Sequence, residues 1–82
     1  MLEALNGAKR RFAGTKQVLR ALSSDCVDSV FIAEDADEFL RKQIFDSCKK
    51  CDIVPIMAPS MKLLGLACKI DVPTACAAIP KT

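Results

Sequence analysis

The sequence predicts an α/β protein, a three-layer α/β/α sandwich around a small mixed four-stranded sheet. Two observations lead to this fold class. Short apolar runs alternate along the chain with segments whose apolar residues recur at helical spacing, and strands that alternate with helices form sheets covered by helices. The 82 residues, of which 51% are apolar and 27% charged, also have the size and balance of one small folded domain over 1–82.

The N-terminal quarter is expected to hold two helices and a short strand. Residues 2–10 are predicted to form a short helix, and 11–13 a brief strand that ends at Gly14. Thr15 is the expected N-cap of a helix over 15–23, because its hydroxyl can accept a hydrogen bond from a free amide of the first turn. The apolar face of this helix is formed by Val18, Leu19 and Leu22.

The middle of the chain predicts a buried strand and a longer helix. Residues 29–33 form a continuous apolar run with β-branched and aromatic members, which indicates a strand covered on both faces. Asp37 is the expected N-cap of a helix over 38–50. One stripe of this helix is apolar and consists of Leu40, Ile44, Cys48 and Cys51.

The last third predicts strand, helix and strand. Residues 53–58 are expected to form a strand, and Pro55 predicts an edge position or an irregularity because proline cannot donate to a ladder. Ser60 is placed to cap a helix over 61–68. The remaining segments are a loop over 69–73 and a final strand over 74–79.

Charge is unevenly distributed along the sequence. The net charge is only +2, but residues 1–20 hold five basic residues and one acid, a local +4, whereas residues 21–38 hold six acids and no base. A basic N-terminal quarter on a nearly neutral chain suggests a local contact with an anion; the alternative is a solvated charged surface.

Composition excludes several classes of function. The chain has no His, which excludes imidazole acid–base catalysis and zinc sites of mixed Cys/His type. It has no nucleophile–base pair and no glycine loop for phosphate, so we expect no enzyme, no cofactor and no small-molecule substrate. The start lacks the pattern of a secretory signal, and the longest apolar stretch, 53–59, is far shorter than the ~18 residues of a membrane span.

The start of the helix over 15–23 is the first candidate binding surface. Lys16, Gln17 and Arg20 are close together on one side of that helix, next to its free amides and the positive end of its dipole. Lys and Arg can bind phosphate or guanine acceptors, and the Gln amide can both donate to and accept from a base edge. The alternative is an ordinary polar face opposite the core.

The loop over 69–74 is the second candidate. Its run Ile70-Asp71-Val72-Pro73 is unusually apolar for a loop, and exposed apolar side chains gain little unless a partner covers them. The alternative is a small packing role within the protein.

Two further patterns have a structural explanation beside a chemical one. Cys48 and Cys51 have the spacing of a metal or redox pair, but the chain offers no second such pair, so packing cysteines in a reducing compartment are favoured. The acids Glu34, Asp35 and Asp37 lie between a strand and a helix, where carboxylates are expected for capping.

Four ordered segments span nearly the whole chain, namely Gly14–Gln17, Phe31–Asp37, Pro59–Cys68 and Asp71–Ala75. Together they resemble the kink-turn RNA-binding ribosomal protein family, which includes the archaeal large-subunit kink-turn binder, its eukaryotic relatives and short bacterial homologues. The Lys16-Gln17 pair and the short length are most similar to the bacterial branch. Archaeal relatives commonly have Asn and Glu at these two positions, and a Gly is usual where this chain has Lys69.

The resemblance implies an α/β/α sandwich that binds kink-turns, sharply bent RNA duplexes flanked by tandem sheared G·A pairs. It implies that Lys16 and Gln17 contact the guanines of those pairs, that Arg20 contacts the backbone, and that Asp37 borders an extruded nucleotide. The loop before the last strand is implied to pack on the bend. The RNA-binding residues expected from the resemblance are Gly14, Thr15, Lys16, Gln17, Arg20, Glu34, Asp37, Lys62, Ile70, Asp71, Val72, Pro73, Thr74 and Ala75.

We therefore predict a non-catalytic, cytoplasmic RNA-binding protein whose partner is structured RNA with kink-turns and which associates with the ribosome. The absence of Trp and Tyr argues against a stacking platform for single strands and favours recognition of a folded RNA. One alternative is a protein-interaction or scaffold module on the same fold. A thiol redox or metal protein built on Cys48 and Cys51 is the other.

Overall fold

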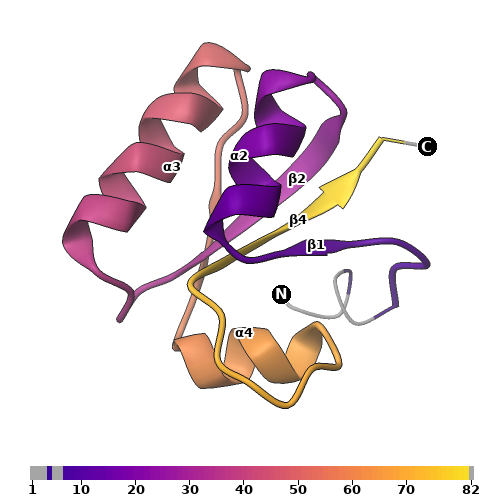
Figure 1. Ribbon diagram of the computed structural model, residues 1–82, viewed down its shortest axis with the longest axis vertical. Helices are drawn as coiled ribbons and strands as arrows, with labels where there is room; N and C mark the ends of the chain where they lie inside the picture. The colour runs from indigo at the N-terminus through magenta and orange to yellow at the C-terminus, as the bar shows by residue number, and fades with distance from the viewer. Residues whose placement is uncertain (1–3, 5–6, 82) are drawn as a thin grey trace.

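The computed structural model describes residue 4 and residues 7–81, and its helices and strands alternate along the chain (Figure 1). The elements are β1 (Phe12–Ala13), α2 (Thr15–Ser23), β2 (Val27–Ala33), α3 (Glu38–Lys50), β3 (Ile56–Ala58), α4 (Met61–Ala67) and β4 (Cys76–Pro80). Of the helix expected over 2–10, residues 2, 3, 5 and 6 lie outside the described residues. Residues 7–10 form a turn and bends, so that helix does not extend to residue 10 as expected.

The four strands form one mixed sheet in the order β1-β4-β2-β3. β2 and β3 run parallel, whereas β4 pairs antiparallel with both β1 and β2. Figure 1 shows α2 and α3 side by side on one face of the sheet and α4 on the other. The predicted three-layer sandwich with a mixed four-stranded sheet is confirmed.

The central strand β2 separates two halves of the core. Val30 and Ile32 pack in a cluster with residues of α2 and α3, whereas Phe31 and Ala33 pack in a second cluster with residues of α4. Side chains alternate between the two faces of a strand, so a run that is apolar at every position fills both layers. This explains why the run over 29–33 has no polar member after its first residue.

Two predicted caps are confirmed and one is corrected. Asp37 accepts hydrogen bonds from the first turn of α3, and Ser60 accepts one from Leu63 N at 3.1 Å. Thr15, however, is the first residue of α2 and not its N-cap. Gly14 takes that position with φ 97°, a backbone angle that favours glycine, and its carbonyl accepts the first helical bond from Val18 N.

The last two strands begin later than expected, for local reasons. Ile53 N donates to Cys48 O at the end of α3, and Pro55 has no amide hydrogen, so β3 begins only at residue 56. Thr74 N donates to Met61 O of α4 and not to a strand, so β4 begins at residue 76. Among the described residues β3 pairs with β2 alone, so the edge position, one of the two outcomes that Pro55 predicted, is confirmed.

Candidate nucleic-acid interface

Three backbone hydrogen bonds bring the sequence-predicted segments together around the start of β4. Gly14 N, just before α2, donates to Cys76 O at 3.0 Å, and Ala33 N, at the end of β2, donates to Ala75 O at 2.9 Å. Thr74 N donates to Met61 O at 3.1 Å, which ties the same loop to the first turn of α4. The start of α2, the turn after β2 and the loop over 69–75 are therefore neighbours at one end of the sheet.

The start of α2 presents polar side chains and unoccupied amides. Lys16, Gln17 and Arg20 are exposed, whereas the opposite side of the helix is buried against the sheet. The N-cap residue Gly14 supplies no side-chain hydrogen bond, and the first turn holds no acid. The first amides of a helix have no partner within it, so this end can accept an anion or an electron-rich base edge.

The acid-rich turn after β2 is largely committed to capping. Asp37 Oδ2 accepts from Phe39 N at 3.0 Å and from Leu40 N at 3.3 Å at the start of α3. Asp35 Oδ1 accepts from Met61 N at 2.8 Å and so caps α4 from a distant part of the chain. Glu34 is exposed. The capping explanation of these acids therefore holds for Asp35 and Asp37.

The loop before β4 offers an apolar surface on a fixed base. Val72 is 61% exposed, and Asp71 and Pro73 are exposed on either side of it. Ile70 is half-buried and packs with the cluster beneath α4, as does Ala75.

Thr74 is among the residues that the resemblance implies for RNA contact, and its side chain is buried. Its hydroxyl donates to Cys76 O at 3.0 Å, so this side chain positions the loop from within. Thr15, also among the expected residues, is only half-buried, and its hydroxyl lies 3.9 Å from the sulfur of Cys76. Lys62 is exposed in the first turn of α4. Its neighbour Met61 donates its amide to Asp35 in the acid-rich turn and accepts at its carbonyl from Thr74 in the loop.

Sequence reasoning missed two residues that hold this arrangement together. A Cβ on Gly65 of α4 would overlap the carbonyl oxygen of Val72, so only glycine allows the loop to lie against the helix. Arg11 donates from Nη1 to Cys68 O at 2.7 Å and from Nη2 to Ala8 O at 2.8 Å, which joins the end of α4 to the segment before β1. Neither the glycine nor the arginine has a local sequence signal for its partner.

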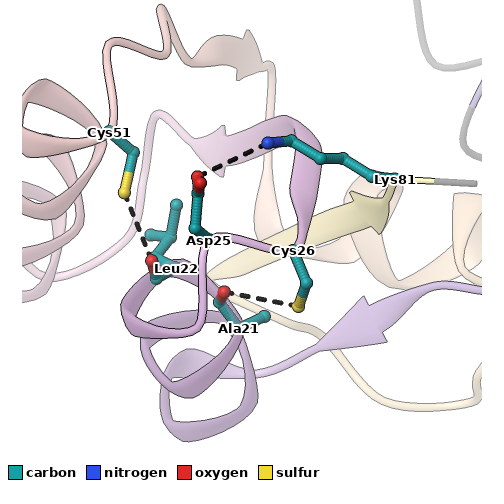
Figure 2. A network of polar contacts seen from close by, with 6 residues as sticks. All are labelled: Ala21, Leu22, Asp25, Cys26, Cys51 and Lys81. Atoms are coloured by element: carbon teal, nitrogen blue, oxygen red, sulfur yellow. Dashed lines mark hydrogen bonds and ion pairs between the residues drawn. The ribbon is translucent and has the colours of Figure 1, made fainter.

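The cysteines belong to the core and to helix ends. Cys48 and Cys76 are buried, and burial, together with smaller contributions from Cys51 and Cys76, raises the pKa of Cys48 to about 11. The Cys51 thiol donates to Leu22 O at 3.2 Å, and the Cys26 thiol donates to Ala21 O at 3.4 Å, both near the end of α2 (Figure 2). A buried protonated thiol is a poor nucleophile and metal ligand, so packing explains Cys48 better than redox or zinc chemistry.

The described residues hold neither a cluster of metal ligands nor a helix that could span a membrane. Within residue 4 and residues 7–81, no cluster of three or more Cys, Asp or Glu side chains is arranged to hold a metal ion. Over the same residues, every helix is too short or too polar to cross a membrane.

Comparison with known proteins identifies the family. The family model described as "Ribosomal protein L7Ae/L30e/S12e/Gadd45 family" matches residues 1–82. The chain belongs to this family. An RNA-binding protein of Geobacillus sp. (strain WCH70) is 39% identical over 72 residues, which are 88% of each chain. Another, from Caldanaerobacter subterraneus subsp. tengcongensis, is 41% identical over 69 residues, or 84% of each chain. The resemblance to a ribosomal RNA-binding family is thereby confirmed.

Solved structures support the fold of this family member. A 15.5 kD RNA-binding protein of Giardia lamblia superposes with a TM-score of 0.85 at 24% identity, covering 99% of this chain and 68% of that one. A Bacillus halodurans protein of unknown function superposes with a TM-score of 0.84 at 21% identity, covering 99% of this chain and 81% of that one. Both similarities show the shared α/β sandwich.

Proposed function

We propose that this protein binds RNA without catalysing a reaction on it, and that it recognises kink-turns in structured RNA. One observation carries the proposal: the hydrogen bond from Gly14 N to Cys76 O joins the polar start of α2 to the exposed apolar loop before β4. Family membership and the names of the curated relatives support RNA as the partner.

The residues at the start of α2 suit the guanine edges of sheared G·A pairs. The Gln17 amide can donate and accept at the same time, which suits an edge that carries both kinds of group. The Lys16 ammonium suits the O6 and N7 acceptors of guanine, and the Arg20 guanidinium, one turn further along, suits a backbone phosphate.

The apolar loop suits the bend itself. In a kink-turn the bend exposes base and sugar surfaces that a straight duplex hides, and Val72 and Pro73 offer an apolar surface to them. The loop is held at its base by Gly65 and Thr74, so little ordering is needed on binding. The protein would then favour bent over extended RNA through its higher affinity for the bent form.

The proposal also covers the bounds of the RNA-binding domain and its location in the cell. Residues 1–82 act as one RNA-binding domain, in the cytoplasm and in association with the ribosome or another structured RNA. The family description, which groups this chain with ribosomal proteins, supports the ribosomal setting. The buried thiols suit a reducing compartment.

The decisive experiment is a binding titration with two RNAs of equal length and charge. One contains a kink-turn, and in the other its G·A pairs are replaced by Watson–Crick pairs. We expect clearly tighter binding to the kink-turn at the same salt concentration, since phosphate contacts alone cannot distinguish the two. Equal affinity would contradict kink-turn recognition, and failure to bind either RNA would favour the scaffold alternative.

A further inference from the structure

Cations line two hollows beside α2 and β1, and one of these cations, Arg20, also belongs to the expected site. The first, of about 520 Å³, lies between Gln17 and Arg20 of α2 and Arg11 and Phe12 of the strand segment. The second, of about 370 Å³, is lined by three cations, Lys9, Arg10 and Lys81, together with Ala8, Ile79 and Pro80.

The two hollows share no lining residue but are near each other in the fold. Arg10 of the second hollow directly precedes Arg11 of the first. Lys81 N donates to Cys26 O at 2.7 Å, and Cys26 lines the first hollow. We call the two hollows together the basic groove and define it by its cations, Arg20, Arg11, Arg10, Lys9 and Lys81.

The charges of the basic groove are largely available to a partner. Lys9 and Arg10 are exposed. Lys81 Nζ lies 3.5 Å from Asp25 Oδ1, and this ion pair is drawn in Figure 2. The two side chains are 54% and 76% exposed, so the pair contributes little to stability. Arg11 is half-buried and its guanidinium donates to two backbone carbonyls, so it is less available to a partner than the other four cations.

We propose that the basic groove binds the backbone phosphates of an RNA stem that continues away from the start of α2. This inference rests on the proposed function, because Gln17 and Arg20 belong to both surfaces. Arg10 is four residues from Gly14, a distance of about 13 Å along an extended chain, so the groove is long enough to meet several successive phosphates. The clustered cations suit a polyanion with regularly spaced charges better than a single small anion.

The test compares a charge-removing variant with a matched control on two RNAs. The variant is Lys9→Gln with Arg10→Gln, and the control is Lys49→Gln with Lys50→Gln, which removes the same charge from exposed residues at the end of α3. Each protein is titrated, over a range of salt, against a kink-turn RNA with long stems and against one whose stems are cut back to their closing pairs. Thermal unfolding verifies that every variant is folded.

We expect the groove variant to lose affinity for the long-stem RNA and to keep its affinity for the trimmed RNA. On the long-stem RNA the groove variant should bind several-fold more weakly at low salt, with a slope of log affinity against log salt that is smaller by about 1.8, as for two lost phosphate contacts. On the trimmed RNA it should behave as wild type does, and the control should match wild type on both. An unchanged slope on the long-stem RNA, or an equal loss on both RNAs, would overturn the proposal.

The result also separates this inference from the proposed function. A groove variant that still prefers the kink-turn over the Watson–Crick control leaves kink-turn recognition intact, whatever its salt slope. A wild-type protein without that preference refutes kink-turn recognition, and the salt slope on long stems still decides whether the basic groove binds phosphates.

Discussion

Two adjacent side chains on the first turn of α2 are expected to supply most of the discrimination between RNAs. Replacing Lys16 or Gln17 by Ala should weaken kink-turn binding by about 1–3 kcal/mol each, because each removes one base contact. The loss is measured by titration against the kink-turn RNA and its Watson–Crick counterpart, and it should be larger for the kink-turn.

The chain contains a natural control for this substitution. Lys42 and Gln43 form the same dipeptide on α3 and are equally exposed. Lys42→Ala with Gln43→Ala should leave the preference for the kink-turn unchanged. If the α2 and α3 substitutions have the same effect, the interface has been assigned to the wrong helix.

The residues that follow three of the helices have an unusual backbone angle. After α2, α3 and α4 the chain turns through a left-handed residue that is not glycine, namely Asp25 at φ 53°, Asp52 at φ 60° and Lys69 at φ 61°. Aspartate tolerates this region better than lysine does, because its short side chain can bond locally. The strain is therefore greatest at Lys69, the position where the resembled family usually has Gly.

Lys69→Gly should accordingly stabilise the protein by about 0.5–1 kcal/mol, since glycine adopts the left-handed region without a Cβ penalty. Asp52→Gly is the matched variant and should gain less. Urea unfolding of both variants against wild type measures the difference. An equal or larger gain at Asp52 would contradict the argument that aspartate tolerates this backbone angle better than lysine does.

At the scale of helices and loops, the contact of α4 with the loop before β4 depends on Gly65. In Gly65→Ala the new methyl group meets the Val72 carbonyl oxygen, so the loop must move. Alanine is the better helix former by about 1 kcal/mol, but the overlap with backbone cannot be relieved by a rotamer change. We expect a net loss of stability of about 1–3 kcal/mol and weaker kink-turn binding.

The neighbouring Leu66→Ala separates the overlap from general effects on α4. Leu66 is 59% exposed in the same helix, so its truncation should change stability and RNA affinity little. Unfolding curves and titrations of the two variants are compared directly. Wild-type RNA affinity in folded Gly65→Ala would show that the position of the loop does not matter for binding.

The edge of the sheet that β3 forms is protected by proline. Ala58 O accepts from Glu34 N in the turn after β2, so the backbone groups of residues 55, 57 and 59 face away from that strand. Two of these three residues are Pro55 and Pro59, which leaves Met57 as the single outward amide of this stretch. An edge with so few donors resists pairing with another chain.

At the scale of the whole molecule, the features that could be predicted from the sequence are those that depend on a local pattern of residues. The layers follow from the alternation of apolar runs and helical stripes, and the caps Asp37 and Ser60 follow from residue type and position. The bond from Met61 N to Asp35 joins residues 26 apart, and that from Arg11 to Cys68 O joins residues 57 apart. Such contacts exist only once the layers have packed, so no local pattern could predict them.

The stability of the packed molecule should depend on pH at the alkaline end. Burial raises the pKa of Cys48 to about 11 from an ordinary 9.0, and burial also raises the pKa of Cys68 and Cys76. The folded protein therefore holds these protons more tightly than the unfolded chain does. The resulting stability is fully present below pH 9 and is lost as the pH rises toward about 11.

Cys48→Ala should reduce this alkaline loss by about 3 kcal/mol, because the rise of the Cys48 pKa from 9.0 to about 11 corresponds to roughly that energy. The quantity to measure is the difference in unfolding free energy between neutral and alkaline pH, obtained from urea curves under reducing conditions. Val30→Ala removes volume from the same core cluster without removing a thiol, so it should lower stability equally at every pH. Parallel pH curves for wild type and Cys48→Ala would mean that the buried thiol does not set the alkaline limit of the fold.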